Sequence, residues 1–218
     1  MVQIDFAIAE AEGTLSPRKG LKRRLFTLSK LVFDKLVALL CLPLIGLAAL
    51  ALLILNPVYN PGPLFYRQKR MGRYGQPFQM IKFRSMLPAG AQTRSHSDGV
   101  EVSRITPLGR IIRKYRIDEL PNMLNVLRHE MSVVGPRPDA WDHAVAYSRE
   151  VPGYADRHAV FPGITGLAQI RQGYAEGTDQ TALKARLDRV YIRQQGFMSE
   201  LAIIFGTVRV ILSGFGAR

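Results

Sequence analysis

The longest run of apolar positions covers residues 36–55, with the sequence LVALLCLPLIGLAALALLIL. It holds 20 residues and contains no charged or strongly polar side chain. A straight α-helix of this length would be roughly 30 Å long, about the thickness of the hydrocarbon core of a bilayer. The run therefore predicts a helix inserted in a membrane, and disfavours the buried core helix of a soluble domain.

Two features of this run favour a helix that enters the membrane and returns to the same side. Pro43, near the middle, removes a backbone hydrogen bond and kinks the helix. Basic residues flank both ends, at 18–30 before the run and at 67–73 after it, and the positive-inside rule places both flanks in the cytoplasm. We expect a re-entrant helix broken at Pro43, and the alternative is a kinked helix that crosses the bilayer.

After the apolar run, the pattern of polar and apolar positions predicts a small mixed α/β part. Residues 64–68 and 78–83 are typical of short strands and are separated by a glycine turn at 72–75. Residues 108–131 are predicted to be mostly helical, because leucines recur within them at i, i+4 and i+7. Further helices are expected at residues 139–150, 181–195 and 199–214.

Charge limits the kinds of partner that the chain can have. It contains 30 lysines and arginines against 17 aspartates and glutamates, a formal net charge of +13. Such an excess implies nucleic acid, anionic lipid head groups or phosphorylated substrates. The basic residues are interleaved with carboxylates and rigid turns, so no nucleic acid is expected. A basic, membrane-tethered protein that binds nucleic acid or anionic lipid is the alternative.

Adjacent carboxylates at Asp118 and Glu119 lie within the segment RIDELPN. A structural role would explain them, because Asp is a preferred N-cap, Glu suits the first turn of a helix, and Pro121 is tolerated there. A helix N-terminus also attracts phosphate, beside which a carboxylate can act as a nucleophile or hold magnesium. By themselves these residues allow both a helix cap and a reaction centre.

Two other segments present basic side chains in defined positions. In GPRP, Arg137 lies between two prolines, which restrict the backbone and present the guanidinium on a stiff loop suited to phosphate. In KFRSM, Lys82 and Arg84 share one face of a strand. The structural alternatives are a surface turn and a solvated basic strand face.

Five segments make the chain, from about Lys30 onward, resemble the bacterial sugar transferases of the monotopic phosphoglycosyl transferase superfamily. The resemblance implies an α/β membrane-associated fold: a tail and basic segment over 1–29, a re-entrant membrane helix over 30–56, and a mixed α/β catalytic part over 57–218. It also implies amphipathic interfacial helices, one of them C-terminal, on the cytoplasmic face of the bacterial inner membrane. The segments, in order, are NPGPLFYRQ, KFRSM, LGRIIRKYRIDELPNMLNVL, MSVVGPRP and HAVFPGITGLAQI.

The resemblance further implies a reaction. Asp118 would attack the β-phosphate of a UDP-sugar, release UMP and form a covalent phosphosugar intermediate, which undecaprenyl phosphate would then take up. Glu119 would bind Mg²⁺. The expected pathways are exopolysaccharide, capsule or O-antigen synthesis, and membrane lipid is an expected partner. The residues that match substrate-binding positions of the family are Lys82, Arg84, Arg113 and Arg137.

Overall fold

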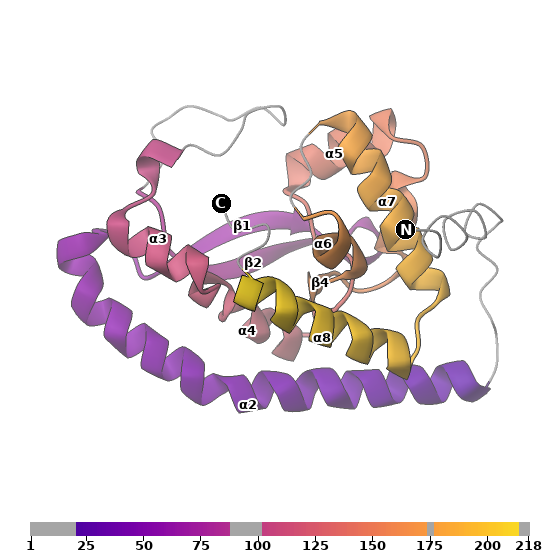
Figure 1. Cartoon of the computed structure of the whole chain (residues 1–218), viewed down its shortest axis with the longest axis horizontal. Coiled ribbons are helices and arrows are strands. Elements are labelled where there is room, and N and C mark those ends of the chain that lie inside the picture. The colour runs from indigo at the N-terminus through magenta and orange to yellow at the C-terminus, as the bar shows by residue number, and fades with distance from the viewer. Residues whose placement is uncertain (1–20, 88–101, 174–176, 214–218) are drawn as a thin grey trace.

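The computed structural model describes residues 21–87, 102–173 and 177–213 (Figure 1). One long helix runs along a body made of shorter helices and two two-stranded sheets. The helices are α2 Leu21–Tyr59, α3 Pro107–Lys114, α4 Asn122–Leu127, α5 Trp141–Glu150, α6 Leu167–Arg171, α7 Thr178–Arg193 and α8 Phe197–Ser213. The strands are β1 Phe65–Met71, β2 Pro77–Phe83, β3 Ser132–Val134 and β4 Gly163–Thr165.

Helix α2 contains the predicted membrane segment. It runs without interruption for 39 residues and contains two prolines, Pro43 near its middle and Pro57 near its end. Figure 1 shows that it is bent. The break predicted at Pro43 is therefore not a gap between two helices, because a helix can absorb the loss of one backbone hydrogen bond by bending.

One stripe of α2 faces the body, and within the apolar run the other faces of the helix are largely exposed. Ala38, Ile45 and Leu52 are buried at helical spacing. On the other faces, Leu40 is 77% exposed and Ile54 is 70% exposed. Among the described residues, α2 is the one helix long and apolar enough to cross a membrane. The mixed α/β fold with a long apolar N-terminal helix is compatible with membrane association.

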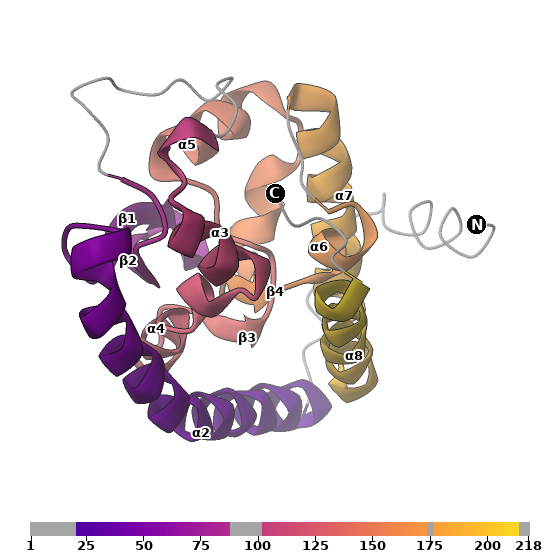
Figure 2. The ribbon, with the colours of Figure 1, turned by 60° about the vertical axis from the view of Figure 1, so that its left-hand side comes forward.

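Polar contacts attach the first part of α2 to the body. The carboxylate of Asp34 accepts hydrogen bonds from the Ser132 hydroxyl at 2.7 Å and from the Val133 amide at 3.1 Å. Lys30 donates to Glu200 of α8 at 2.6 Å. Figure 2 shows α8 close to this end of α2. The buried charges near the start of the helix are therefore paired with the body.

The far end of α2 is also attached. Asn60 is fully buried, donates to the carbonyl oxygen of Arg84 at 3.0 Å, and accepts from the hydroxyl of Thr106 at 3.3 Å. The same Thr106 hydroxyl caps α3 by accepting from Gly109 N at 2.9 Å. Both ends of the long helix therefore contact the same body, with β1 and β2 at this end (Figure 2).

The two sheets are small. Strands β1 and β2 form the predicted antiparallel hairpin, with Phe65 opposite Phe83 and Met71 opposite Pro77. Strands β3 and β4 pair in parallel. Asn125 of α4 binds the edge of β2, accepting from Ile81 N at 3.0 Å. This contact sets α4, and the turn that precedes it, against the hairpin.

The region 108–131 is mostly helical, as predicted, but its helices are separate. Helix α3 ends at Lys114 and α4 begins at Asn122. Between them, Arg116 has φ 57° and ψ 21°, in the left-handed region, and a single 3-10 turn follows over Ile117–Glu119. The leucines that predicted a helix lie at the end of this turn and in the short helix α4. The Asp118–Glu119 pair therefore lies in the break between α3 and α4.

Candidate active site

Three segments far apart in the sequence bring positive charge to the carboxylate of Glu119. Lys82, near the end of β2, donates from Nζ to Oε1 over 3.2 Å. Arg137, in the loop after β3, donates from both terminal nitrogens, one of them to Oε2 at 3.1 Å. Arg116, in the turn before the pair, reaches Oε1 at 3.5 Å. Three cations therefore enclose one buried carboxylate.

This arrangement keeps Glu119 ionised. Burial raises its pKa, but the charges of Arg137 and then Lys82 outweigh burial and hold the pKa well below the ordinary range. Burial lowers the pKa of Lys82, and the negative charge of Glu119 opposes that shift. With Arg116 also present, the site carries more positive than negative charge and is suited to an anionic ligand.

Asp118 differs from Glu119 both in its hydrogen bonds and in the direction of its pKa shift. It is 6% exposed, and its Oδ1 is buried with no hydrogen-bond partner. Burial raises its pKa; Lys82 opposes the shift and Glu119 adds to it. A buried polar atom without a partner is rare in folded proteins and calls for an explanation. An oxygen held free beside several cations can attack, or coordinate, a group that is brought to the site.

The structure does not support a capping role for Asp118. Helix α4 begins with Pro121 at its N-cap, and no side chain donates or accepts a capping hydrogen bond there. Asp118 lies three residues earlier, in the 3-10 turn. The left-handed conformation of Arg116 lies between the end of α3 and this turn. The helix-cap interpretation is therefore wrong.

The remaining predicted site residues, Arg113 and Arg84, differ in their relation to the Asp118–Glu119 pair. Arg113, on α3, contacts Met86 Sδ at 3.7 Å, and its charge lowers the pKa of Asp118. Arg84 follows β2 and donates to the carbonyl oxygen of Pro61 at 3.4 Å, in the turn after α2. The structure thus brings Lys82, Arg113 and Arg137 to the pair, whereas the described contacts of Arg84 do not reach it.

The pair could hold magnesium only with help from a ligand. Within the described part of the chain, no group of three or more His, Cys, Asp or Glu side chains is arranged for a metal ion. Mg²⁺ commonly binds one or two carboxylates and completes its shell with water and substrate phosphates. The unpartnered Oδ1 of Asp118 and the adjacent carboxylate of Glu119 fit that kind of site.

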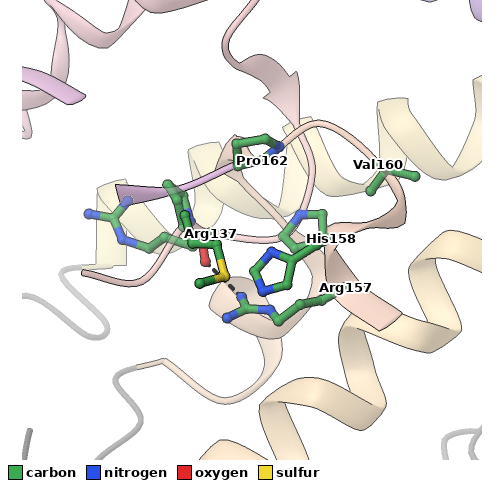
Figure 3. Close-up of a pocket in the computed structure, with 8 residues that line it drawn as sticks. Arg137, Arg157, His158, Val160 and Pro162 are labelled. Atoms are coloured by element: carbon green, nitrogen blue, oxygen red, sulfur yellow. Dashed lines mark hydrogen bonds between the residues drawn. The ribbon is translucent and has the colours of Figure 1, made fainter. Parts of the chain in front are cut away.

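A small pocket lies behind Arg137. Its lining includes Arg157, His158, Val160 and Pro162 (Figure 3). The figure shows the guanidinium of Arg137 directed away from this pocket, while its carbonyl oxygen accepts the hydrogen bond drawn from Arg157. Burial lowers the pKa of His158 to about 4, so its ring is neutral. The pocket does not include Asp118 or Glu119.

A second group of charges, behind the Arg137 loop, was not predicted from the sequence. Arg157 and Asp188 are buried, and Asp139 and Lys184 are mostly buried. They lie on three separate stretches of the chain, with Lys184 and Asp188 both on α7, so no spacing could have revealed that these stretches meet. The one signal was the position of Asp139, immediately after GPRP.

Comparison with known proteins gives consistent matches. A family model described as bacterial sugar transferase matches residues 25–214. The chain is 38% identical, over its whole length, to a UDP-N-acetylgalactosamine-undecaprenyl-phosphate N-acetylgalactosaminephosphotransferase from Aeromonas hydrophila, and spans 50% of that protein. It is 41% identical to a UDP-glucose:undecaprenyl-phosphate glucose-1-phosphate transferase from Caulobacter vibrioides, over 92% of the chain and 76% of the relative. It is 31% identical to the exopolysaccharide production protein ExoY from Sinorhizobium fredii, over 97% of the chain and 95% of the relative.

The matched region includes both parts of the molecule described above. It begins within α2 and ends just after α8, and it contains Asp118, Glu119 and Arg137. Two of the three relatives are covered over more than two thirds of their length. The chain belongs to the bacterial sugar transferase family.

Proposed function

We propose that this protein transfers a sugar 1-phosphate from a UDP-sugar to undecaprenyl phosphate and releases UMP. The relatives from Aeromonas and Caulobacter are named as transferases to undecaprenyl phosphate, one for N-acetylgalactosamine and one for glucose. The observation that carries the proposal is the unpartnered buried oxygen of Asp118, beside a carboxylate held by three cations. The ExoY relative favours exopolysaccharide synthesis as the pathway.

The proposed reaction has two steps at phosphorus. In the first, an oxygen of the Asp118 carboxylate bonds to the β-phosphorus of the UDP-sugar. The bond from that phosphorus to the bridging oxygen breaks, and UMP leaves with the bridging oxygen. In the second, a phosphate oxygen of undecaprenyl phosphate bonds to the same phosphorus and the bond to Asp118 breaks. The lipid then carries a diphosphate-linked sugar, and the carboxylate is restored.

The charges around Glu119 suit this substrate. A diphosphate brings negative charge, and the planar guanidinium of Arg137 can bind two phosphate oxygens at once. Lys82 and Arg113 both lower the pKa of Asp118 against the effect of burial, so they favour the ionised form that attacks. Arg84 is the weakest of the proposed substrate contacts, since its guanidinium donates to Pro61 in the turn after α2.

We also propose Mg²⁺ as the cofactor, with Glu119 as its ligand and substrate phosphate oxygens completing the shell. When bound, the ion would neutralise charge on the diphosphate. Each Glu119 oxygen already accepts from a cation, so the carboxylate would exchange one of these contacts for the metal. Arg137 is the cation that the arriving phosphates would compete for.

The contacts of α2 favour re-entry on the cytoplasmic face of the bacterial inner membrane. The body binds the helix near its start, at Asp34, and at its end, at Asn60. If α2 crossed the bilayer, the body would have to lie inside the hydrocarbon beside it. A bent helix that returns to one face leaves the body in water and places the site at the level of the lipid phosphate.

The activity is tested with purified protein in detergent, Mg²⁺, undecaprenyl phosphate and a panel of UDP-sugars. We expect UMP from at least one UDP-sugar, and loss of its release in Asp118→Asn and in Glu119→Gln. Full turnover by Asp118→Asn would exclude the covalent route. Salt-sensitive DNA binding, with no UMP from any UDP-sugar, would favour the nucleic-acid alternative instead.

Re-entry is tested separately in intact cells. Two single-cysteine variants are made in a Cys41→Ala background. Glu10→Cys places the cysteine before α2, and Arg67→Cys places it after α2, at an exposed position of β1. We expect a membrane-impermeant maleimide to label neither cysteine until the inner membrane is opened. Labelling of one of the two in intact spheroplasts would show that α2 crosses the membrane.

A further inference from the structure

The loop that carries Arg137 is held at four consecutive carbonyl groups. Each carbonyl oxygen from residue 136 to residue 139 accepts a hydrogen bond, and the donors come from three parts of the body, so the backbone of the loop has little freedom. The bonds are Gly163 N to Pro136 O at 2.9 Å, Arg157 to Arg137 O at 2.7 Å, Arg70 to Pro138 O at 2.9 Å and Met71 N to Asp139 O at 3.3 Å.

Arg157 makes the most extensive of these contacts. Its side chain is 1% exposed and lies behind the loop (Figure 3). One terminal nitrogen donates to the carbonyl oxygen of Arg137, and the other donates to the carboxylate of Asp139. Nε donates to Asp188 of α7 at 3.0 Å. A single guanidinium therefore holds the loop on both sides of Pro138 and joins it to α7.

The charges around Arg157 are balanced. Asp139 accepts from Lys184 and from the Tyr154 hydroxyl, each at 2.6 Å. Although burial raises its pKa, Lys184 and Arg157 outweigh burial and lower it below the ordinary range. We call this group the Arg157 frame; its members are Asp139, Tyr154, Arg157, Lys184 and Asp188.

We propose that Arg157 is a positioning residue, which acts on the reaction only by fixing the direction of the Arg137 guanidinium toward Glu119 and the arriving diphosphate. This inference rests on the proposed function. Arg157 itself faces the back of the loop and does not contact Asp118 or Glu119 in the described structure. Its fork geometry is what makes it suitable, because a lysine has one charged atom and cannot hold the Arg137 carbonyl, Asp139 and Asp188 together.

The test is a double-mutant cycle on kcat and KM for the UDP-sugar. In the native background, we expect Arg157→Lys to lower kcat/KM by about 10- to 100-fold, because a small misplacement of a binding group costs this much. In an Arg137→Lys background, the same substitution should cost less than about 3-fold, because the fork that it positions is already gone. Equal losses in both backgrounds would overturn the proposal and make Arg157 merely structural.

Two controls separate positioning from folding. Arg189 lies on the same helix as Asp188 but forms its ion pair with Asp156, at 3.9 Å. Arg189→Lys should therefore leave kcat/KM within about 2-fold of the native value. If Arg157→Lys does not fold, Asp188→Asn enters the cycle in its place and should show the same dependence on Arg137.

Failure of the proposed function would be recognised first, as a native protein that releases no UMP from any UDP-sugar. The positioning role is then measured by hydrogen exchange of a peptide that contains the amide of Met71, which donates to the carbonyl oxygen of Asp139. We expect this peptide to exchange at least about 10-fold faster in Arg157→Lys than in native protein or Arg189→Lys. Unchanged exchange would overturn the inference.

Discussion

Two groups of buried charge lie on either side of the Arg137 loop and are built in opposite ways. In the front group, cations outnumber carboxylates and one carboxylate oxygen has no partner. In the Arg157 frame behind it, two cations meet two carboxylates, and a tyrosine donates to one of these. The front group consists of Lys82, Arg116, Asp118, Glu119 and Arg137.

The difference assigns the two groups to different tasks. A balanced buried network stabilises one conformation, whereas an excess of charge and an unpartnered oxygen destabilise the folded state until a ligand arrives. Proteins accept such instability where they bind and react. The loop joins the two groups, since its backbone belongs to the frame and the Arg137 side chain belongs to the site.

The largest expected effect separates the groups by activity. Asp118→Asn removes the proposed nucleophile and should lower UMP release by at least about 1,000-fold, or about 4 kcal/mol of transition-state stabilisation. Asp139→Asn, the same substitution behind the loop, should retain measurable turnover. The rates of UMP release by the two purified variants are compared. A similar loss of activity in both would contradict the separation of the two groups.

The next effect concerns folding stability. Asp139→Asn leaves Lys184 and Arg157 short of a negative charge, and we expect the free energy of unfolding to fall by about 3 kcal/mol. Thermal unfolding in detergent measures the shift. An unchanged midpoint would show that the frame contributes nothing to the fold.

Asp118→Asn should shift stability in the other direction. The carboxylate is buried and its Oδ1 has no partner, so removing its charge should raise the free energy of unfolding by about 1 kcal/mol. The inactive variant would then unfold at a higher temperature than the active protein. A lower midpoint for Asp118→Asn would mean that the carboxylate is stabilised in the fold after all.

The smallest expected effect is that the stability gained by Asp118→Asn depends on pH. Burial raises the pKa of Asp118, so the folded protein takes up a proton more readily than the unfolded chain does. As pH falls through this raised pKa, the native protein is stabilised, and the advantage of Asp118→Asn should shrink. Unfolding midpoints of both proteins from pH 7 to pH 4 give the comparison; an advantage that grows in acid would reverse the sign of the shift.

Much of this arrangement was predictable from the sequence because it depends on local pattern. The apolar run predicted the helix that became α2, and the glycine turn predicted the β1–β2 hairpin. The stiff GPRP loop and the basic strand predicted the side chains that approach the pair, with Lys82 and Arg137 now in contact with Glu119. Arg84, on the same predicted face as Lys82, lies elsewhere because β2 ends at Phe83.

The rest depends on long-range contacts or on strained backbone. Nothing in the sequence marks Arg116 for a left-handed conformation, which disfavours residues other than glycine, and this residue separates α3 from the turn that holds Asp118. Asp34 and Lys35 lie just before the apolar run. Their partners, on β3 and at the end of α4, lie about a hundred residues away along the chain, and no spacing indicates them.

The central claim is that Asp118 becomes covalently attached to the sugar phosphate. Native protein should be incubated with Mg²⁺ and the active UDP-sugar, without undecaprenyl phosphate, and then quenched in acid for mass spectrometry of intact protein and peptides. We predict a mass increase of one sugar phosphate, located at Asp118, which disappears when undecaprenyl phosphate is added and is absent from Asp118→Asn. An active protein that shows no adduct, or an adduct that persists in Asp118→Asn, would contradict it.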